Sequence, residues 1–329
     1  MPQPSIGQVH VNRPLTNISV ATIQDLDYFA WTREGILPSD KKSDLYFIYN
    51  QNDWLRDEAQ LRGTAMESAG GGYNVSTTPF NCQVYAYHKD VDEQVRSNTD
   101  DPLDGKRDAI KFVTRKMLIR QERQGVSDFF STGIWTGSST GGDLTLGSGF
   151  ALRWDDPTST PIEDVQVQQA ALLTNCGWLP NRFNLGFQVY QKLIRHPDVI
   201  DLIKYGASPG SPAIANEAAL AKIFSVDEVV VSKSVYASNV ENATAVYALT
   251  AGKNAMLEYL AEKPGLYTMS SRYSFMWKGV SYGLGETIGA YEIPMPWLGL
   301  TTKRCEAQIA FANQIINANA GAFFSAVVN

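Results

Sequence analysis

The first 88 residues contain the feature that most limits what this chain can fold into, an extended segment with little of its own to pack against. Residues 53–88 are predicted to form a long β-hairpin, because residues 81–88 alternate with period two and the glycines at 70–72 provide a bend. Large apolar residues are few between positions 64 and 78, and an isolated two-stranded ribbon is only marginally stable in water. We therefore expect this hairpin to lie on a neighbouring surface.

Residues 1–52 show little helical periodicity and are interrupted by Pro14, Pro38 and a polar turn at 39–44. Their apolar and aromatic side chains can be held only by packing onto something else. Two interpretations stay open: an N-terminal subdomain of short strands, or an extended arm that lies on a partner.

The composition predicts a folded protein without a general affinity for nucleic acid. Of the 329 residues, 44% are hydrophobic and 19% are charged, which provides a core and argues against extensive disorder. The 28 basic and 34 acidic residues give a formal net charge of −6, unlike a generally basic nucleic-acid binder. Apolar runs stay short of the roughly 18 residues that span a bilayer, and the N-terminus lacks a signal-peptide pattern. We expect a protein made in the cytosol without membrane contact, and the length alone suggests about two domains.

Residues suited to catalysis or metal binding are scarce. The three His and three Cys are scattered without a Cys-x-x-Cys pair, which excludes zinc-finger and redox motifs. Two Gly-x-Ser-x-Gly matches, at 137–141 and 279–283, lack the helix that a nucleophile elbow requires. The glycines at 283–289 resemble a dinucleotide-binding turn, but Pro294 and Pro296 exclude the helix that should follow. We predict no catalytic, cofactor-binding or metal site and no cofactor; a soluble enzyme with an undetected active site is the alternative from a different class.

The clearest helix is predicted for residues 101–126, with Asp101 as its N-cap and Pro102 in the first turn. Residues 104–123 contain seven basic and three acidic side chains, a local charge of +4 that leaves −10 on the rest of the chain. The basic residues flank both sides of an apolar stripe. This pattern fits either a solvated amphipathic helix whose long side chains cover the edge of the core or a helix that faces phosphate groups.

The remaining sequence predicts a mixed α/β region after a stretch rich in Gly, Ser and Thr at 131–149. Pro161 is expected to start a helix that Gly177 ends, and further helices are expected at 189–195 and 216–223. Short strands are predicted at 183–187, 228–231, 246–249, 255–260, 273–280 and 307–311.

Four motifs that follow one another between residues 154 and 204 carry a family resemblance. They are Trp154-Asp155-Asp156-Pro157, Ser159-Thr160-Pro161-Ile162-Glu163-Asp164-Val165, Gly177-Trp178-Leu179-Pro180-Asn181, and the segment from Leu185-Gly186 through Leu193-Ile194-Arg195-His196-Pro197 to Lys204. Together they resemble tailed-bacteriophage major capsid proteins of the Hong Kong 97-type fold. The resemblance extends less sharply over the whole chain.

The resemblance implies an α+β subunit with an N-terminal arm, an extended β-hairpin called the E-loop, a long spine helix, a peripheral domain and a mixed α/β axial domain. The arm and E-loop of this family reach onto adjacent subunits, which would supply the burial that residues 1–88 lack. The expected division is an arm at 1–52, the E-loop at 53–90, a peripheral domain at 91–160 with the spine helix at about 101–126, an axial domain at 161–260, peripheral return strands at 261–300, and a C-terminal part at 301–329 returning to the axial domain.

The implied function is structural, that of a major capsid protein assembling into hexamers and pentamers of an icosahedral phage head around double-stranded DNA. We expect it in the virion, after assembly in the cytoplasm of a host bacterium. The expected partners are further copies of the chain, DNA bound without sequence specificity, a separate scaffolding protein, a portal and decoration proteins. An encapsulin-like nanocompartment shell is the alternative with the same fold.

Two groups of site residues follow as hypotheses. Contacts between subunits are expected in the arm and hairpin at Phe29, Trp31, Trp54, Arg56, Arg62 and Tyr73. The spine helix of the family lies toward the shell interior, so contacts with packaged DNA are expected at Lys111, Arg115, Lys116 and Arg120.

The chain also departs from some members of the family. No Lys occurs between Lys42 and Lys89, so a covalent cross-link through an E-loop lysine is not expected. Only about 50 residues precede the predicted hairpin, so a fused N-terminal scaffolding domain is not expected either.

Overall fold

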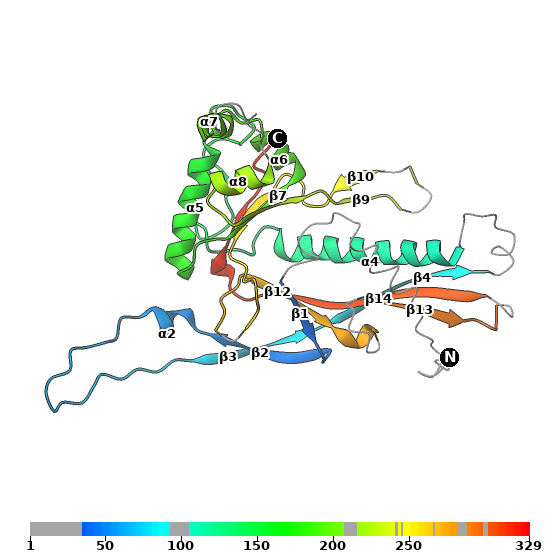
Figure 1. The fold of residues 1–329 in the computed structure, drawn as a ribbon, viewed down its shortest axis with the longest axis horizontal. Coiled ribbons are helices and arrows are strands. Elements are labelled where there is room, and N and C mark those ends of the chain that lie inside the picture. Colours follow the sequence, from blue (N-terminus) through cyan, green and yellow to red (C-terminus); the bar gives the residue numbers. More distant parts are fainter. Residues whose placement is uncertain are drawn as a thin grey trace.

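The computed structural model describes residues 35–92, 105–206, 216–240, 243–244, 246–265, 267–281, 288–298 and 302–329. Figure 1 shows a long sheet covered by a long helix, a smaller α/β unit above it, and a two-stranded ribbon that projects to the left. Most of the expected N-terminal arm, with Phe29 and Trp31, lies outside the described residues. None of the described helices is long and apolar enough to cross a membrane.

The long sheet is built around β14 (Lys303–Ile315), which has neighbours on both edges. On one edge β4 (Gln83–Val91) pairs with it antiparallel. On the other edge, two strands pair antiparallel with successive parts of β14. They are β13 (Ile288–Pro294), which pairs with residues 303–309, and β12 (Arg272–Trp277), which pairs with residues 311–315. The sheet is completed by β1 (Ile36–Ser39), which runs parallel to β12.

The predicted long helix is confirmed as α4 (Gly105–Phe129), which lies on one face of this sheet. The predicted start at Asp101 and Pro102 lies outside the described residues, and the helix ends beyond the expected position 126. Its apolar stripe packs on the sheet, where Val113 and Met117 lie against Ile309 and Phe311. The helix is long because this stripe follows β14 along its length.

The α/β unit contains a four-stranded sheet in the order β15 (Gly321–Phe324), β11 (Ala255–Glu258), β7 (Arg182–Gly186) and β8 (Glu228–Ser232). Strands β7 and β8 are parallel, and the other two pairs are antiparallel. Its helices are α5 (Pro161–Cys176), α6 (Phe187–Leu193), α7 (Pro197–Gly206) and α8 (Glu217–Ile223).

The helix ends in this unit confirm the local sequence signals. Helix α5 starts at Pro161 and ends at Gly177, whose φ of 78° is the left-handed conformation that glycine adopts without strain. The Gly177 N–H donates to the Leu173 carbonyl at 2.9 Å. Helix α8 begins after Asn216, whose side chain accepts a hydrogen bond from the Ala219 N–H at 2.8 Å.

The projecting ribbon corrects the predicted hairpin. It pairs β2 (Ser43–Tyr49) with β3 (Val75–Asn81), and the short helix α2 (Gln51–Leu55) follows β2. The first strand therefore precedes the predicted start at 53, and β4 belongs to the long sheet instead. The alternation at 81–88 was real, but its partner is β14, more than 200 residues away in sequence. The period-two pattern alone does not identify a strand's partner.

Two further boundaries differ from the expected division. Residues 303–315 form the centre of the long sheet, so only β15 from the C-terminal part joins the α/β sheet. The Gly-, Ser- and Thr-rich stretch contributes Leu144 to the core of the α/β unit, and Phe150 and Trp154, which follow the stretch, are buried in the same core. The remaining short elements are β5 (Thr145–Leu146), β6 (Gly149–Phe150), β9 (Val235–Ala237), β10 (Tyr247–Leu249), η3 (Lys278–Ser281) and η4 (Ala318–Ala320).

Candidate assembly surfaces

The base of the ribbon is fixed to the long sheet by aromatic packing. The ring of Phe80 in β3 stacks on Phe275 in β12, with centroids 4.2 Å apart and planes inclined by 8°. Tyr46 in β2 lies 5.3 Å from the same ring. The Cys82 N–H donates to the Lys42 carbonyl at 2.8 Å, where β3 passes into β4. The ribbon therefore leaves the body in one direction, although it contains only two strands.

The opposite face of the ribbon is apolar and exposed. Side chains alternate between the two faces of a strand, so Leu45 and Phe47 point away from the side occupied by Tyr46. Leu45 is 58% exposed and Phe47 is 62% exposed, and their cross-strand partners are Pro79 and Thr77. This stripe is absent from the predicted contact residues. The alternation Leu45-Phe47-Tyr49 was a usable signal, but it lay in the segment expected to be an arm.

The far part of the ribbon is shaped by an aromatic cluster. Trp54 and Tyr73, two of the predicted contact residues, lie together with ring centroids 5.4 Å apart. Tyr49 lies 6.1 Å from each of them, and 4.9 Å from Tyr267. Trp54 and Tyr73 still keep more than half of their surface exposed. Beyond the cluster, the loop carries Leu61, which is fully exposed. A loop so rich in exposed apolar area is typical of a binding surface.

The two predicted arginines stabilise the shape of this loop within the chain. Arg56 pairs with Asp53 at 2.7 Å and with Glu58 at 3.2 Å. The Arg62 Nε donates to the Met66 carbonyl at 2.7 Å. Both arginines are exposed, so these contacts leave part of each guanidinium accessible.

A second anchor joins the ribbon to the α/β unit. The Gln51 Nε2 donates to the Asn175 carbonyl at the end of α5, at 2.8 Å. The Gln51 Oε1 accepts from the Asn317 Nδ2 at 3.2 Å. One side chain thus connects the start of α2 to two separate parts of the body.

The predicted basic residues of α4 form an exposed positive surface with aromatic rings between them. Lys111, Arg115, Lys116 and Arg120 are all exposed. The Lys116 ammonium lies 5.3 Å from the centroid of Phe112, which is itself 42% exposed. Lys89 and Arg123 extend this positive face: Lys89 lies over Phe112 at 5.5 Å and Arg123 over Tyr236 at 4.3 Å. Within the face, Arg120 lies over Tyr85 at 4.8 Å. Cations held over aromatic faces form a preorganised surface for anionic groups.

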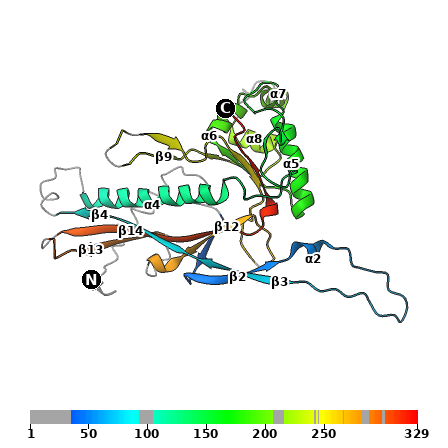
Figure 2. The same cartoon turned by 180° about the vertical axis from the view of Figure 1, so that it is seen from behind.

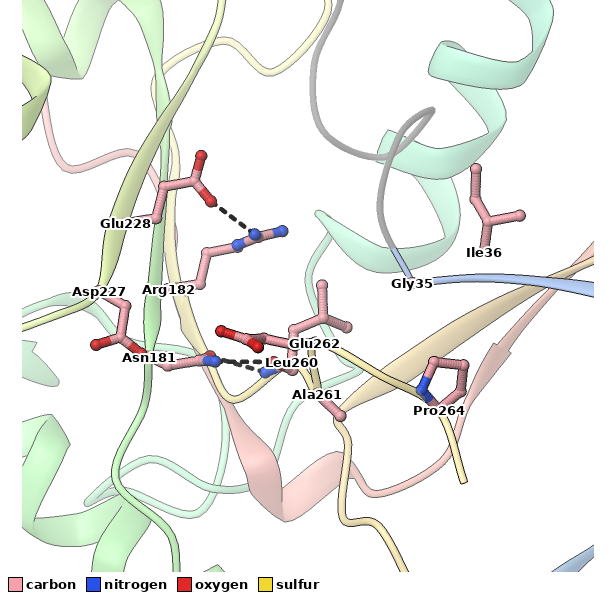
Figure 3. Close-up of a pocket in the computed structure, with 10 residues that line it drawn as sticks. All are labelled: Gly35, Ile36, Asn181, Arg182, Asp227, Glu228, Leu260, Ala261, Glu262 and Pro264. Carbon is pink, nitrogen blue, oxygen red and sulfur yellow. Dashed lines mark hydrogen bonds and ion pairs between the residues drawn. The ribbon is translucent and has the colours of Figure 1, made fainter. Parts of the chain in front are cut away.

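A cavity of about 400 Å³ lies at the edge of the α/β unit. Figure 3 shows the residues that line it. Arg182 and Glu228 form an ion pair of 2.7 Å in its wall. The side chain of Asn181 donates to the Leu260 carbonyl at 2.8 Å and accepts from the Leu260 N–H at 2.9 Å. Among the described residues that line the cavity, the ionisable side chains are Arg182, Asp227, Glu228 and Glu262, and there is no His, Cys, Ser or Lys.

Other chemical motifs resolve into structural roles. The Gly-x-Ser-x-Gly segment at 137–141 is a turn in which the Ser139 N–H donates to the Gln168 Oε1 at 2.8 Å. His196 is buried, with its Nε2 3.1 Å from the Ser159 hydroxyl. Its Nδ1 accepts from the Asp198 N–H at 3.3 Å, so it caps the start of α7 rather than the carbonyl end of α6. Among the described residues, no group of three or more His, Cys, Asp or Glu could hold a metal ion.

Similar folds occur in phage and encapsulin shells. A phage-related protein from Bordetella bronchiseptica RB50 aligns over 97% of this chain and 98% of its own, with a TM-score of 0.69 and 15% identity. The capsid protein of Cyanophage P-SCSP1u aligns over 88% and 85%, with a TM-score of 0.56 and 10% identity. The encapsulin of the holo-SrpI complex from Synechococcus elongatus PCC 7942 aligns over 99% and 94%, with a TM-score of 0.53 and 12% identity. The chain therefore has the mixed α+β Hong Kong 97-type capsid fold, as the resemblance predicted.

A sequence match connects the chain to one kind of shell protein. The major capsid protein of Burkholderia phage BcepMu is 28% identical over 160 residues, which are 48% of this chain and 47% of that relative. The match thus spans about half of the length of each protein. No protein-family model matches the chain. The predicted resemblance to phage major capsid proteins is confirmed by this relative.

Proposed function

We propose that this chain is the major capsid protein of a tailed-phage head, a structural subunit without catalytic function. The observation that carries the proposal is the ribbon of β2 and β3, which leaves the body of a capsid fold with one apolar face exposed. Such a face is stable in water only when another surface covers it. Identical subunits supply that surface to one another in a closed shell of hexamers and pentamers.

The parts of the fold suit the roles of capsid subdomains. We assign the α/β unit as the axial domain, the long sheet with α4 as the peripheral domain and spine helix, and the ribbon as the E-loop. The domain limits follow the strands: the E-loop runs from β2 to β3, and the peripheral domain includes β4, β12, β13 and β14.

The E-loop supplies the proposed contacts between subunits. Trp54 and Tyr73 offer aromatic surface on a cluster that is already ordered within the chain, which lowers the entropy lost on binding. Arg56 and Arg62 are held by contacts within their own loop and present exposed charged groups on it. Aromatic and Arg side chains are the residue types that dominate binding energy at interfaces. Many modest contacts of this kind become cooperative in a closed shell.

The basic face of α4 suits non-specific contact with packaged double-stranded DNA. Its cations attract phosphate without reading base sequence. The chain is acidic as a whole, so this local surface concentrates positive charge on one element. The further partners that we propose are a separate scaffolding protein, a portal and decoration proteins, and the final location is the virion.

Expression of the full chain in bacteria followed by electron microscopy tests the proposed function. We expect shells or isolated capsomers, and shells formed during infection should contain double-stranded DNA. Shells that contain an enzyme cargo instead would assign the chain to the encapsulin alternative. A chain that stays monomeric under all assembly conditions would contradict both.

A further inference from the structure

Helix α5 presents an exposed face without charge. No Asp, Glu, Lys or Arg occurs from residue 165 to residue 181. Val165 and Leu172 point into the core, whereas Val167 and Leu173 are 54% and 46% exposed. Just past the end of the helix, Trp178 and Leu179 are also exposed, at 47% and 58%. We call the surface of Val167, Ala170, Leu173, Trp178 and Leu179 the α5 face.

A second exposed apolar surface lies on the hairpin of β9 and β10, which we call the finger. The register pairs Tyr247 with Ala237 and Leu249 with Val235, so these side chains share its outer face. Tyr247 is 71% exposed and Val235 is 45% exposed, and the neighbouring Val246 is 55% exposed. Residues 235–240, 243–244 and 246–249, the described part of the finger, contain no charged side chain.

The finger is held in place at its root. Tyr236, on the inner face, lies beneath the Arg123 guanidinium of α4 at 4.3 Å. The Ser234 hydroxyl donates to the buried Glu122 carboxylate of α4 at 3.0 Å. A two-stranded hairpin is marginal alone, and these contacts fix only its inner face and root. The outer face is therefore presented in a defined direction.

The two surfaces lie at opposite ends of the molecule. Figures 1 and 2 place α5 and the ribbon on one side and the finger on the other. The ribbon passes beside the end of α5 at the start of α2, since the Gln51 side chain donates to the Asn175 carbonyl at 2.8 Å. A neighbour that lies under the ribbon is therefore also next to the α5 face. In a head-to-tail ring, that neighbour presents its opposite side, which carries the finger.

We infer that the α5 face of one copy packs on the outer face of the finger of the next copy, head to tail, around each capsomer. This inference rests on the proposed function, and it names the partner surface and the direction of the contact. Both surfaces are apolar and uncharged, so their contact removes apolar area from water and desolvates no ion. A contact between two different patches repeats in one direction and closes a ring, whereas a contact of α5 with α5 stops at a dimer.

Matched charge variants test the direction of the contact. Leu173→Asp damages the α5 face and Tyr247→Asp damages the finger, while both positions are exposed enough to keep the fold. The fraction of chains in capsomers is measured by native mass spectrometry. For each variant alone, this fraction should be at least tenfold lower than for the wild type. A mixture of the two should form a heterodimer through its one intact pair of surfaces and nothing larger. Leu146→Asp, at a 53% exposed site on β5, is the control and should assemble normally.

Cysteine cross-linking provides an independent measurement in assembled particles. The double variant Leu173→Cys with Tyr247→Cys should give a ladder of disulfide-linked chains beyond the dimer under oxidising conditions. Each single variant should give none, because the three native thiols are buried. Dimers from Leu173→Cys alone would show that α5 meets α5, and intact particles without any ladder from the double variant would also overturn the inference. A wild-type chain that never assembles would instead contradict the proposed function.

Discussion

Arg272 and Glu258 form a fully buried, bidentate ion pair that joins the long sheet to the four-stranded sheet of the α/β unit. The Arg272 Nε lies 2.9 Å from Glu258 Oε2, and its Nη2 lies 3.0 Å from Oε1. Arg272 begins β12 of the long sheet and Glu258 ends β11 of the α/β unit. The carboxylate also accepts from Asn184 at 2.7 Å and from Ser271 at 2.9 Å. The guanidinium lies 4.9 Å from the ring of Phe129, the last residue of α4. This pair is therefore one of the contacts that hold the long sheet and the α/β unit together.

Glu258→Gln should destabilise the fold strongly, because it removes the negative charge that neutralises a buried guanidinium. We expect a loss of about 3–5 kcal/mol in the free energy of unfolding, measured by chemical denaturation. Adding Arg272→Met should recover part of that loss. Asp90→Asn is the matched control, since it breaks the exposed Arg304 pair of 2.8 Å and should cost at most about 1 kcal/mol. Equal losses at the two sites would contradict the role of burial.

The same pair should make stability depend on pH. Burial opposes ionisation of Glu258, but the charge of Arg272 and its hydrogen bonds outweigh it and hold the pKa below the ordinary value of 4.5. The contribution is therefore complete above that ordinary value and is lost as the pH falls through the lower folded pKa. The stability difference between the wild type and Glu258→Gln should be constant near neutral pH and shrink below about pH 4.5. A difference that does not change at acid pH would contradict this.

Gly321→Ala should destabilise the junction between η4 and β15. A methyl group at this position would overlap the indole ring of Trp135. That ring is 1% exposed and its Nε1 donates to the Phe129 carbonyl at 2.7 Å, so it has no room to move. We expect a loss of about 1–3 kcal/mol in thermal or chemical unfolding. Gly142→Ala, where a methyl group meets nothing within 4 Å, is the control and should leave stability nearly unchanged.

The three thiols should be unreactive in the folded chain. Cys82 and Cys305 have no exposed surface and Cys176 is 3% exposed. Burial raises the pKa of Cys82 and of Cys305 to about 11, which removes the reactive thiolate near neutral pH. Ellman's reagent at pH 8 should titrate none in the native protein and three per chain after unfolding. Rapid reaction of any thiol with the reagent in the native protein would contradict this prediction and show that its site opens to solvent.

Trp54→Ala should separate assembly from folding. The side chain is 54% exposed, so its removal should change the free energy of unfolding by no more than about 1 kcal/mol. Capsomer formation, followed by light scattering, should nevertheless fall, because the proposed E-loop contact loses its largest ring. Trp54→Phe keeps an aromatic ring and is the matched control. Normal assembly of the alanine variant would remove Trp54 from the interface.

Local sequence signals were sufficient to predict the elements of the α/β unit. The long sheet could not be predicted in the same way, because its strands pair over long distances in sequence. Pro161 and Gly177 act on their own helix, so its limits follow from sequence. The strand at Gln83–Val91 shows its alternation just as clearly, but its partner lies at 303–311 and no turn connects them. The buried Glu258 stands within the apolar run Ala255 to Leu260, which marks it as unusual without revealing that Arg272 is its partner. The exposed apolar face of the ribbon was not predicted either. Alternation shows that two faces of a strand differ, but which face is exposed depends on what the strand packs against.

Replacing Lys111, Arg115 and Lys116 by Gln should weaken DNA retention. Each cation that contacts a phosphate adds up to about 0.9 to the slope of log affinity against log salt, so the triple variant should lower this slope by up to about 3. The measurements are filter binding of isolated capsomers to double-stranded DNA over a salt series and the DNA content of particles. Lys192→Gln with Lys222→Gln, on α6 and α8, is the control for lost positive charge away from α4. If α4 faces the DNA, both the slope and the DNA content should change more in the triple variant than in the control variant. An unchanged slope together with an unchanged DNA content would contradict the proposed DNA contact.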